Sequence, residues 1–257
     1  PANRRNAGID QFQRRVWLHE QVAQASRMAQ IGDVEPARRQ LATLKAHAGG
    51  DPQLLGAIAQ AYVDAGDKAE ALALMRPAVG NSQTASADTL LPYAAVLLKS
   101  GEDAQAAEVL RQLQKMPLSV DQHRGFQDLV SLYTVRQAEA TRQRGDLVAA
   151  YDILQPVLKR RPDDTQAQGA LARMYASAGD RDKAMEIYRS LQTRDPDNAQ
   201  LQLAVAGIAY EADDWRSAEA ALNQALRLAP RDPEILAGAA RIYRARGRTG
   251  RAAELYQ

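Results

Sequence analysis

The stretch AGDRDKAMEIY, residues 178 to 188, decides the fold, because variants of it recur along the whole chain. The turn at its centre, Gly179, has six counterparts, and the spacings along the seven turns are 34, 35, 44, 34, 34 and 34 residues. An alanine follows every one of these turn residues at a distance of five positions. A fixed period of this length indicates a repeat architecture. The seven turn residues are Gly32, Gly66, Gly101, Gly145, Gly179, Asp213 and Gly247, and the alanines are Ala37, Ala71, Ala106, Ala150, Ala184, Ala218 and Ala252.

The turns carry the residues that end one helix and begin another. Glycine suits the left-handed conformation that closes a helix, and the next residue is Asp33, Asp67, Asp146 or Asp180 in four turns, where a carboxylate can accept from free amides. Asp51-Pro52 and Asp232-Pro233 place a cap and an N1 proline where a new repeat begins. The alanines let two helices approach closely. The sequence therefore predicts antiparallel helix pairs.

Composition supports an all-α protein and narrows the function classes. The chain has 257 residues, of which 46% are hydrophobic and 5% aromatic, and it has no cysteine. The net charge is +2 and the two signs are interspersed, so the chain has no large positive field that would attract a nucleic acid. The sequence contains no run of 18 apolar residues, the length that a membrane-spanning helix needs. The three histidines, His19, His47 and His123, lie far apart. We therefore expect no enzyme, no metal and no cofactor, with no nucleic acid as a partner and no insertion into a membrane.

The period and its small residues resemble the tetratricopeptide repeat, a family of two antiparallel helices per unit. With the turn residue counted as the fifteenth position, Tyr62, Tyr175 and Tyr243 occupy the eleventh. Pro162, Pro196 and Pro230 stand near the thirty-second. The eighth position is Ala59, Ala94, Ala138, Ala172, Ala206 and Ala240. The resemblance covers nearly the whole chain and implies a right-handed superhelical solenoid of about seven repeats, with a core along its length.

One interval of 44 residues breaks the period and predicts a helical insertion. Ser119 to Gln122 has the form of a capping box, while Gly125 makes a kink as reasonable as a straight helix. We expect repeats 1 to 3 over residues 1–113, with an extended first helix at 10–31, and an irregular helical insertion with a hinge over 114–135. Repeats 4 to 7 follow over 136–257, the last one truncated. Because the chain starts at Pro1 and ends inside an apparent helix, we expect it to be a piece of a longer protein.

In tetratricopeptide repeats the first helix of each pair lines the inner groove, so the resemblance implies a set of binding residues. They occupy first-helix positions near the second, fifth, ninth and twelfth to thirteenth. Each is equally well explained as a solvated polar residue. The candidates are Gln53, Gln60, Asp64, Arg136, Glu139, Arg142, Gln143, Gln166, Arg173, Gln200, Tyr210, Glu211, Glu234, Arg241 and Arg244.

The Ala/Gln/Arg-rich style, the C-terminal DPEILAGAARIYRARGRTGRAAELYQ and the insertion are similar to the periplasmic repeat region of the bacterial cellulose synthase C subunits. That resemblance implies a non-catalytic periplasmic scaffold, within a parent protein anchored in the outer membrane. It would guide exported glucan or contact peptidoglycan and protein partners of a polysaccharide synthase and export complex. The alternative is a generic peptide-binding or assembly adaptor.

Overall fold

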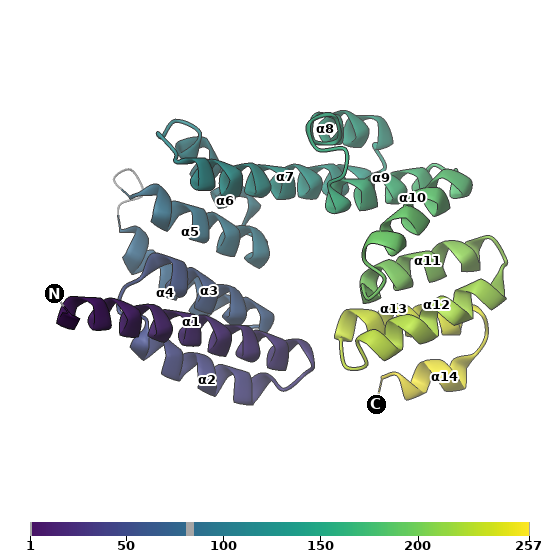
Figure 1. Ribbon diagram of the computed structural model, residues 1–257. Helices are drawn as coiled ribbons and strands as arrows, with labels where there is room; N and C mark the ends of the chain where they lie inside the picture. The colour runs from purple at the N-terminus through teal and green to yellow at the C-terminus, as the bar shows by residue number, and fades with distance from the viewer. Residues whose placement is uncertain (1, 81–84, 257) are drawn as a thin grey trace. The chain divides into compact units, whose positions relative to one another are not determined.

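The computed structural model describes residues 2–80 and 85–256, and over these ranges the chain forms fourteen α-helices and no strand (Figure 1). The helices follow one another as seven pairs. In chain order they are α1 (Ala2–Gln30), α2 (Val34–His47), α3 (Pro52–Asp64), α4 (Lys68–Val79), α5 (Ala87–Ser100), α6 (Asp103–Leu113), α7 (Val120–Gln143), α8 (Leu147–Arg160), α9 (Thr165–Ser177), α10 (Arg181–Arg194), α11 (Ala199–Glu211), α12 (Trp215–Leu228), α13 (Pro233–Ala245) and α14 (Thr249–Glu254).

The turns between paired helices have the conformation that the repeat pattern predicts. All six turn glycines have a positive φ, between 75° and 93°. Asp213 takes the same place in the sixth pair with φ 58°, and no other non-glycine residue within the described ranges has a positive φ. A side chain with a Cβ atom is disfavoured in this region. Asp213 therefore adopts the turn conformation for which the other six pairs use glycine.

Most of the predicted helix caps are confirmed. The side chains of Asp67, Asp146 and Asp180 each accept a hydrogen bond from a backbone amide three residues later. Asp51 and Asp232 cap α3 and α13, each followed by a proline at the first helical position. These bonds satisfy amides that have no partner inside the helix. The prediction was wrong for one residue, since Asp33 makes no such bond to α2.

The alanines at the two fixed positions are packing residues. The seven that follow the turns are at most 4% exposed, and the six at the eighth position are completely buried. In the second pair, for example, Ala59 of α3 and Ala71 of α4 bring the two helices together. A longer side chain at either place would separate two backbones that are in close contact. The alanines of the repeat pattern therefore mark the positions at which paired helices are in close contact.

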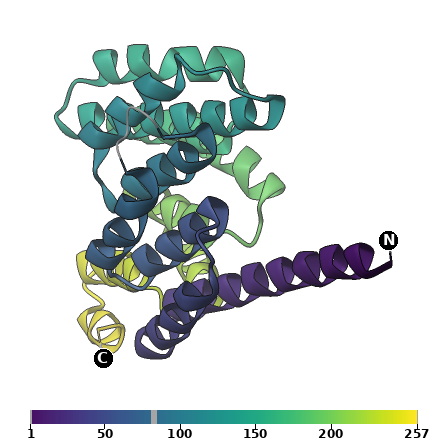
Figure 2. The same ribbon diagram turned by 90° about the vertical axis from the view of Figure 1, so that its left-hand side faces the viewer.

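The chain divides into two compact units, Pro1–Tyr133 and Thr134–Gln257, and the boundary falls inside α7. In the first unit the first helices α1, α3 and α5 pack side by side, with α2, α4 and α6 beside them (Figures 1 and 2). Large buried side chains such as Leu41, Ile58, Met75 and Leu97 fill its core. No helix in the described part of the chain is both long and apolar enough to cross a membrane.

The second unit repeats this packing through α9 to α14. Its core holds Tyr188, Leu222 and Tyr243, and the C-terminal part of α7 contributes Val135 to a neighbouring cluster. α11 contacts α12 and α13, as successive pairs of a stacked array do.

The ten additional residues of the long interval lie in α7, which is helical through Gly125. The predicted capping box opens this helix: Gln122 N donates to Ser119 Oγ at 3.3 Å, and Ser119 N donates to Gln122 Oε1 at 2.9 Å. Phe126 and Val130 pack against the core of the first unit. The domain boundaries and the hinge between residues 114 and 135 stay predictions.

Candidate partner-binding groove

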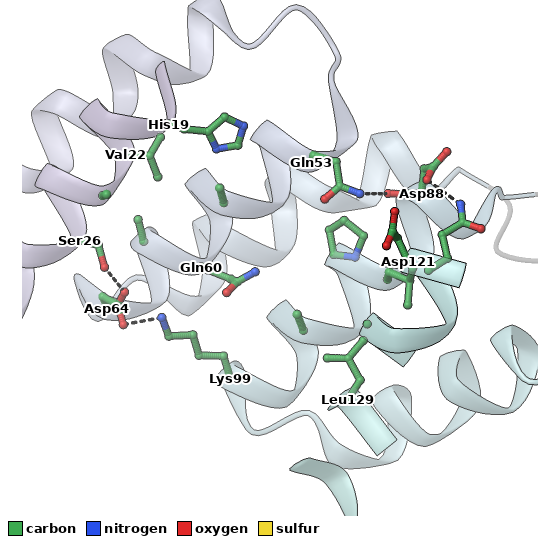
Figure 3. A pocket seen from close by; sticks show the side chains of 18 of the residues that line it. His19, Val22, Ser26, Gln53, Gln60, Asp64, Asp88, Lys99, Asp121 and Leu129 are labelled. Atoms are coloured by element: carbon green, nitrogen blue, oxygen red, sulfur yellow. Dashed lines mark hydrogen bonds and ion pairs between the residues drawn. The ribbon is translucent and has the colours of Figure 1, made fainter. Parts of the chain in front are cut away.

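The first unit has a groove of about 810 Å³ on the side formed by its first helices. α1, α3, α5 and the N-terminal part of α7 line it. Three candidates from the sequence, Gln53, Gln60 and Asp64, lie in it on α3 (Figure 3). They occupy the second, ninth and thirteenth positions of the repeat. The structure therefore brings together candidates that the register placed on one helix face.

One end of the groove has a carboxylate linked to both neighbouring helices. Asp64 Oδ2 accepts from Ser26 Oγ of α1 at 2.5 Å, and Asp64 Oδ1 is 2.6 Å from Lys99 Nζ of α5. The Asp64 side chain is only 12% exposed. Because a buried carboxylate is costly unless it is paired, these two contacts hold the charge in place and tie three helices together.

The other end is rich in amides and exposed carboxylates. Gln122 Nε2 of α7 donates to Asp88 Oδ1 at 2.8 Å, and Gln53 Nε2 donates to the Asp88 carbonyl oxygen at 3.5 Å. Asp121 lies beside them on the groove wall and is largely exposed. This end therefore combines negative charge with hydrogen-bonding side chains.

Small and apolar side chains form the floor between these ends. Ala57, Ala95 and Pro92 line it, and Figure 3 shows the amide of Gln60 reaching into the groove between the two polar ends. None of the described residues that line this groove is Phe, Tyr or Trp. An alanine floor with amides along it can accept an extended backbone, whose N–H and C=O groups need partners of both kinds.

Four lining residues were missed by sequence reasoning although the register could have found them. His19 and Asp88 occupy the second position of their repeats, Ser26 the ninth and Lys99 the thirteenth. The candidate set does not extend to these positions of the first and third repeats. Asp121 and Gln122 give no such signal, since they lie in the insertion, outside the register.

In the second unit the candidates of α7 and α9 form an ionic cluster. Arg142 donates to Glu139 through Nε and Nη2, with a shortest distance of 2.6 Å, and Arg173 Nε lies 3.2 Å from Glu139 Oε2. Arg142 Nη1 also donates to Ser177 Oγ at 2.7 Å. Burial alone would raise the pKa of Glu139, but the hydrogen bond from Arg142 and the charge of Arg173 outweigh it and lower that pKa. The cluster fixes an ionised Glu139 between two guanidinium groups.

The remaining candidates lie along α7, α9, α11 and α13. Gln200 Nε2 donates to Glu234 Oε2 at 3.2 Å, which joins the second positions of two consecutive repeats. Glu211 pairs instead with Arg181 of α10, at 3.6 Å. Gln143, Gln166, Arg241 and Arg244 are exposed, and Arg136 and Tyr210 are half-buried.

The sequence and the fold define the same class of protein. Two family models, both described as tetratricopeptide repeat, match residues 142–208 and 206–257. A tetratricopeptide-repeat protein of Parabacteroides merdae, 16% identical, superposes with a TM-score of 0.54 over 93% of this chain and 90% of that one. One of Thermus thermophilus, 21% identical, has a TM-score of 0.54 over 74% of this chain and 98% of that one. The predicted tetratricopeptide repeats are therefore confirmed in this chain.

The curated relatives of this chain belong to a narrower group of proteins than the structures that share its fold. The chain is 40% identical over 255 residues to "Cellulose synthase operon protein C" of Pseudomonas fluorescens SBW25, a match covering 99% of this chain and 20% of that protein. The protein of that name from Xanthomonas axonopodis pv. citri is 40% identical over 188 residues, 72% of this chain and 12% of that one. The predicted similarity to this group is confirmed, and the chain spans a fifth or less of these two relatives.

Proposed function

We propose that this chain is a non-catalytic repeat scaffold of a bacterial cellulose or exopolysaccharide export system. The observation that carries the proposal is the 40% identity to cellulose synthase operon protein C over 99% of the chain. We further propose that the chain works in the periplasm, within a parent protein anchored in the outer membrane. There it would organise synthase and envelope proteins, with glucan or peptidoglycan as further contacts.

The groove of the first unit is the surface that we assign to a protein partner. It is large enough for a peptide segment, and its amides and carboxylates can pair with main-chain groups and with a basic side chain. The contacts of Asp64 with Ser26 and Lys99 connect three helices at one end of it. A groove held in this way needs little reordering when a partner binds, which favours affinity.

A chimera tests the proposal. The aligned 255-residue segment of the Pseudomonas fluorescens protein is replaced by this chain, and secreted cellulose is measured in cells that lack the original gene. We expect secretion to be restored. A chimera that accumulates normally and restores no cellulose would contradict the function.

Two alanine substitutions then test the groove within that chimera. Ala95 lies in the groove, whereas Ala73 is exposed on α4, outside the residues that line it. Ala95→Arg places a long charged side chain in the groove and should reduce cellulose secretion, whereas Ala73→Arg should not. Equal secretion by both variants would exclude the groove as the functional surface.

The alternative function is a peptide-binding adaptor outside polysaccharide export. The groove itself favours it, because its described lining combines amides and carboxylates without a Phe, Tyr or Trp on which a sugar ring could stack. Titration of the chain with peptides, set beside the result from the chimera, separates the two functions. An inactive chimera together with specific peptide binding that Ala95→Arg removes would favour the adaptor.

A further inference from the structure

A second cavity, of about 550 Å³, lies in the second unit between α8, α9 and α10. Leu171 and Ile187 give it apolar walls, and Tyr151 and Tyr175 add two aromatic rings from successive repeats. Tyr151 is 41% exposed. The volume of the cavity, and its mixture of aromatic and polar side chains, are typical of small-ligand sites.

The repeat does not require an aromatic residue at the position of Tyr151. It is the residue that directly follows the buried alanine of its pair, Ala150. In the other six repeats this position is occupied by Arg38, Leu72, Ala107, Met185, Glu219 and Ala253. One period later the counterpart of Tyr175 is Ala209, and that repeat folds equally well. The pairing of two tyrosines at one cavity is therefore particular to this place in the chain.

The polar groups of the cavity are suited to hydroxyls and leave it close to neutral. Gln168, Glu186 and Ser190 line it and offer both donors and acceptors. Gln168 Nε2 donates to the Pro162 carbonyl oxygen at 2.5 Å, which fixes the orientation of the amide. Among the described residues that line the cavity, Lys183 is the one cation. Its Nζ is 2.8 Å from Asp180 and 5.2 Å from the centre of the Tyr175 ring. A neutral ligand fits these groups better than a strongly charged one.

We propose that this cavity binds a neutral saccharide, a short stretch of a β-linked glucose chain. The C–H face of a pyranose ring is apolar and stacks on the exposed ring of Tyr151, while Gln168, Glu186 and Ser190 bond its hydroxyls. The choice of glucose rests on the proposed function in cellulose export. The site is separate from the groove of the first unit, since its residues all lie between 151 and 190.

Nuclear magnetic resonance titration of the 257-residue chain tests the site, with cellohexaose as probe and maltohexaose and a neutral hexapeptide as comparisons. We expect cellohexaose to shift the backbone resonances around Tyr151, Gln168 and Lys183 in a saturable way. Tyr151→Ala should weaken binding by about fivefold or more, which is the loss of one stacking contact. Tyr151→Phe keeps the ring and should stay within about twofold of the original affinity.

Tyr256→Ala is the matched control, because Tyr256 is 62% exposed and lies outside the cavity. It should bind as the original chain does. Unchanged affinity in Tyr151→Ala, no saturable shift by about 10 mM cellohexaose, or equal binding of the hexapeptide at these residues would overturn the proposal. If binding fails while the chimera secretes cellulose, the saccharide site alone is rejected; if binding holds while the chimera fails, the export function is rejected.

Discussion

Glu139 and Arg173 occupy the ninth position of consecutive repeats, and Arg173 Nε meets Glu139 Oε2 at 3.2 Å. The same relationship recurs between other first helices: Asp64 and Lys99 join two thirteenth positions at 2.6 Å. Gln200 and Glu234 join two second positions at 3.2 Å. Stacking places equivalent residues of neighbouring repeats beside one another. In these three pairs a polar residue therefore interacts with its own counterpart in the next repeat.

The first prediction concerns pH. Because the pKa of Glu139 is lowered below its usual 4.5, its ionised form stabilises the fold above that value, and this contribution disappears as the pH falls through the lowered pKa. Glu139→Gln should lower the urea midpoint at pH 7, and the difference from the original chain should shrink towards about pH 3. Arg173→Met should reduce the same pH dependence while leaving the carboxylate in place. A difference that is constant over this range would contradict the assignment.

The second prediction concerns the turn at Asp213. Asp213→Gly should raise the free energy of unfolding by about 0.5–1 kcal/mol, because glycine adopts the positive φ without steric cost. The lost pair with Arg246, at 3.0 Å, is largely exposed and contributes little. The converse change, Gly179→Asp, should destabilise the chain by a similar amount. Urea unfolding of both variants measures this, and a destabilised Asp213→Gly would refute it.

The third prediction compares two helical glycines. A Cβ atom at Gly56 would lie 2.4 Å from Pro92 Cβ, and one at Gly238 would lie 2.4 Å from Leu203 Cδ2. The proline ring is fixed to the backbone of α5, whereas a leucine side chain can change rotamer. Gly56→Ala should therefore cost about 1–3 kcal/mol of stability, and Gly238→Ala clearly less. Thermal unfolding of the two variants checks the order, and equal losses would contradict the distinction between a fixed proline and a mobile leucine.

The fourth prediction compares two ion pairs of equal length. Lys99 Nζ to Asp64 and Lys45 Nζ to Glu70 are both 2.6 Å, but Asp64 is 12% exposed and Glu70 is 35% exposed. Lys99→Met leaves a shielded carboxylate without its cation and should cost about 1–2 kcal/mol. Lys45→Met should cost less than about 0.5 kcal/mol. Denaturant unfolding of the two variants measures both losses of stability. Similar losses would mean that the shielding of Asp64 is unimportant.

Much of the fold could be predicted from the sequence because its determinants are local. Gly179 and Asp180 set one turn and one cap by themselves, and the same pair of functions recurs at a fixed period. Asp213 also agrees with a locally determined turn, because aspartate and asparagine are the non-glycine residues that most often adopt a positive φ. The missing cap at Asp33 shows the limit, because residue type alone does not fix the side-chain geometry.

The lining of the candidate groove could be predicted only in part. The register identified Gln53, Gln60 and Asp64, and it could also have identified Ser26 and Lys99. It could not place Gln122 against Asp88, nor could it show that Tyr151 and Tyr175 line one cavity. The sequence by itself determined the helix pairs, their turns and the buried alanines, since these depend on neighbouring residues and on the period. Only the tertiary structure decided which side chains of separate helices meet, because that depends on how the helices stack.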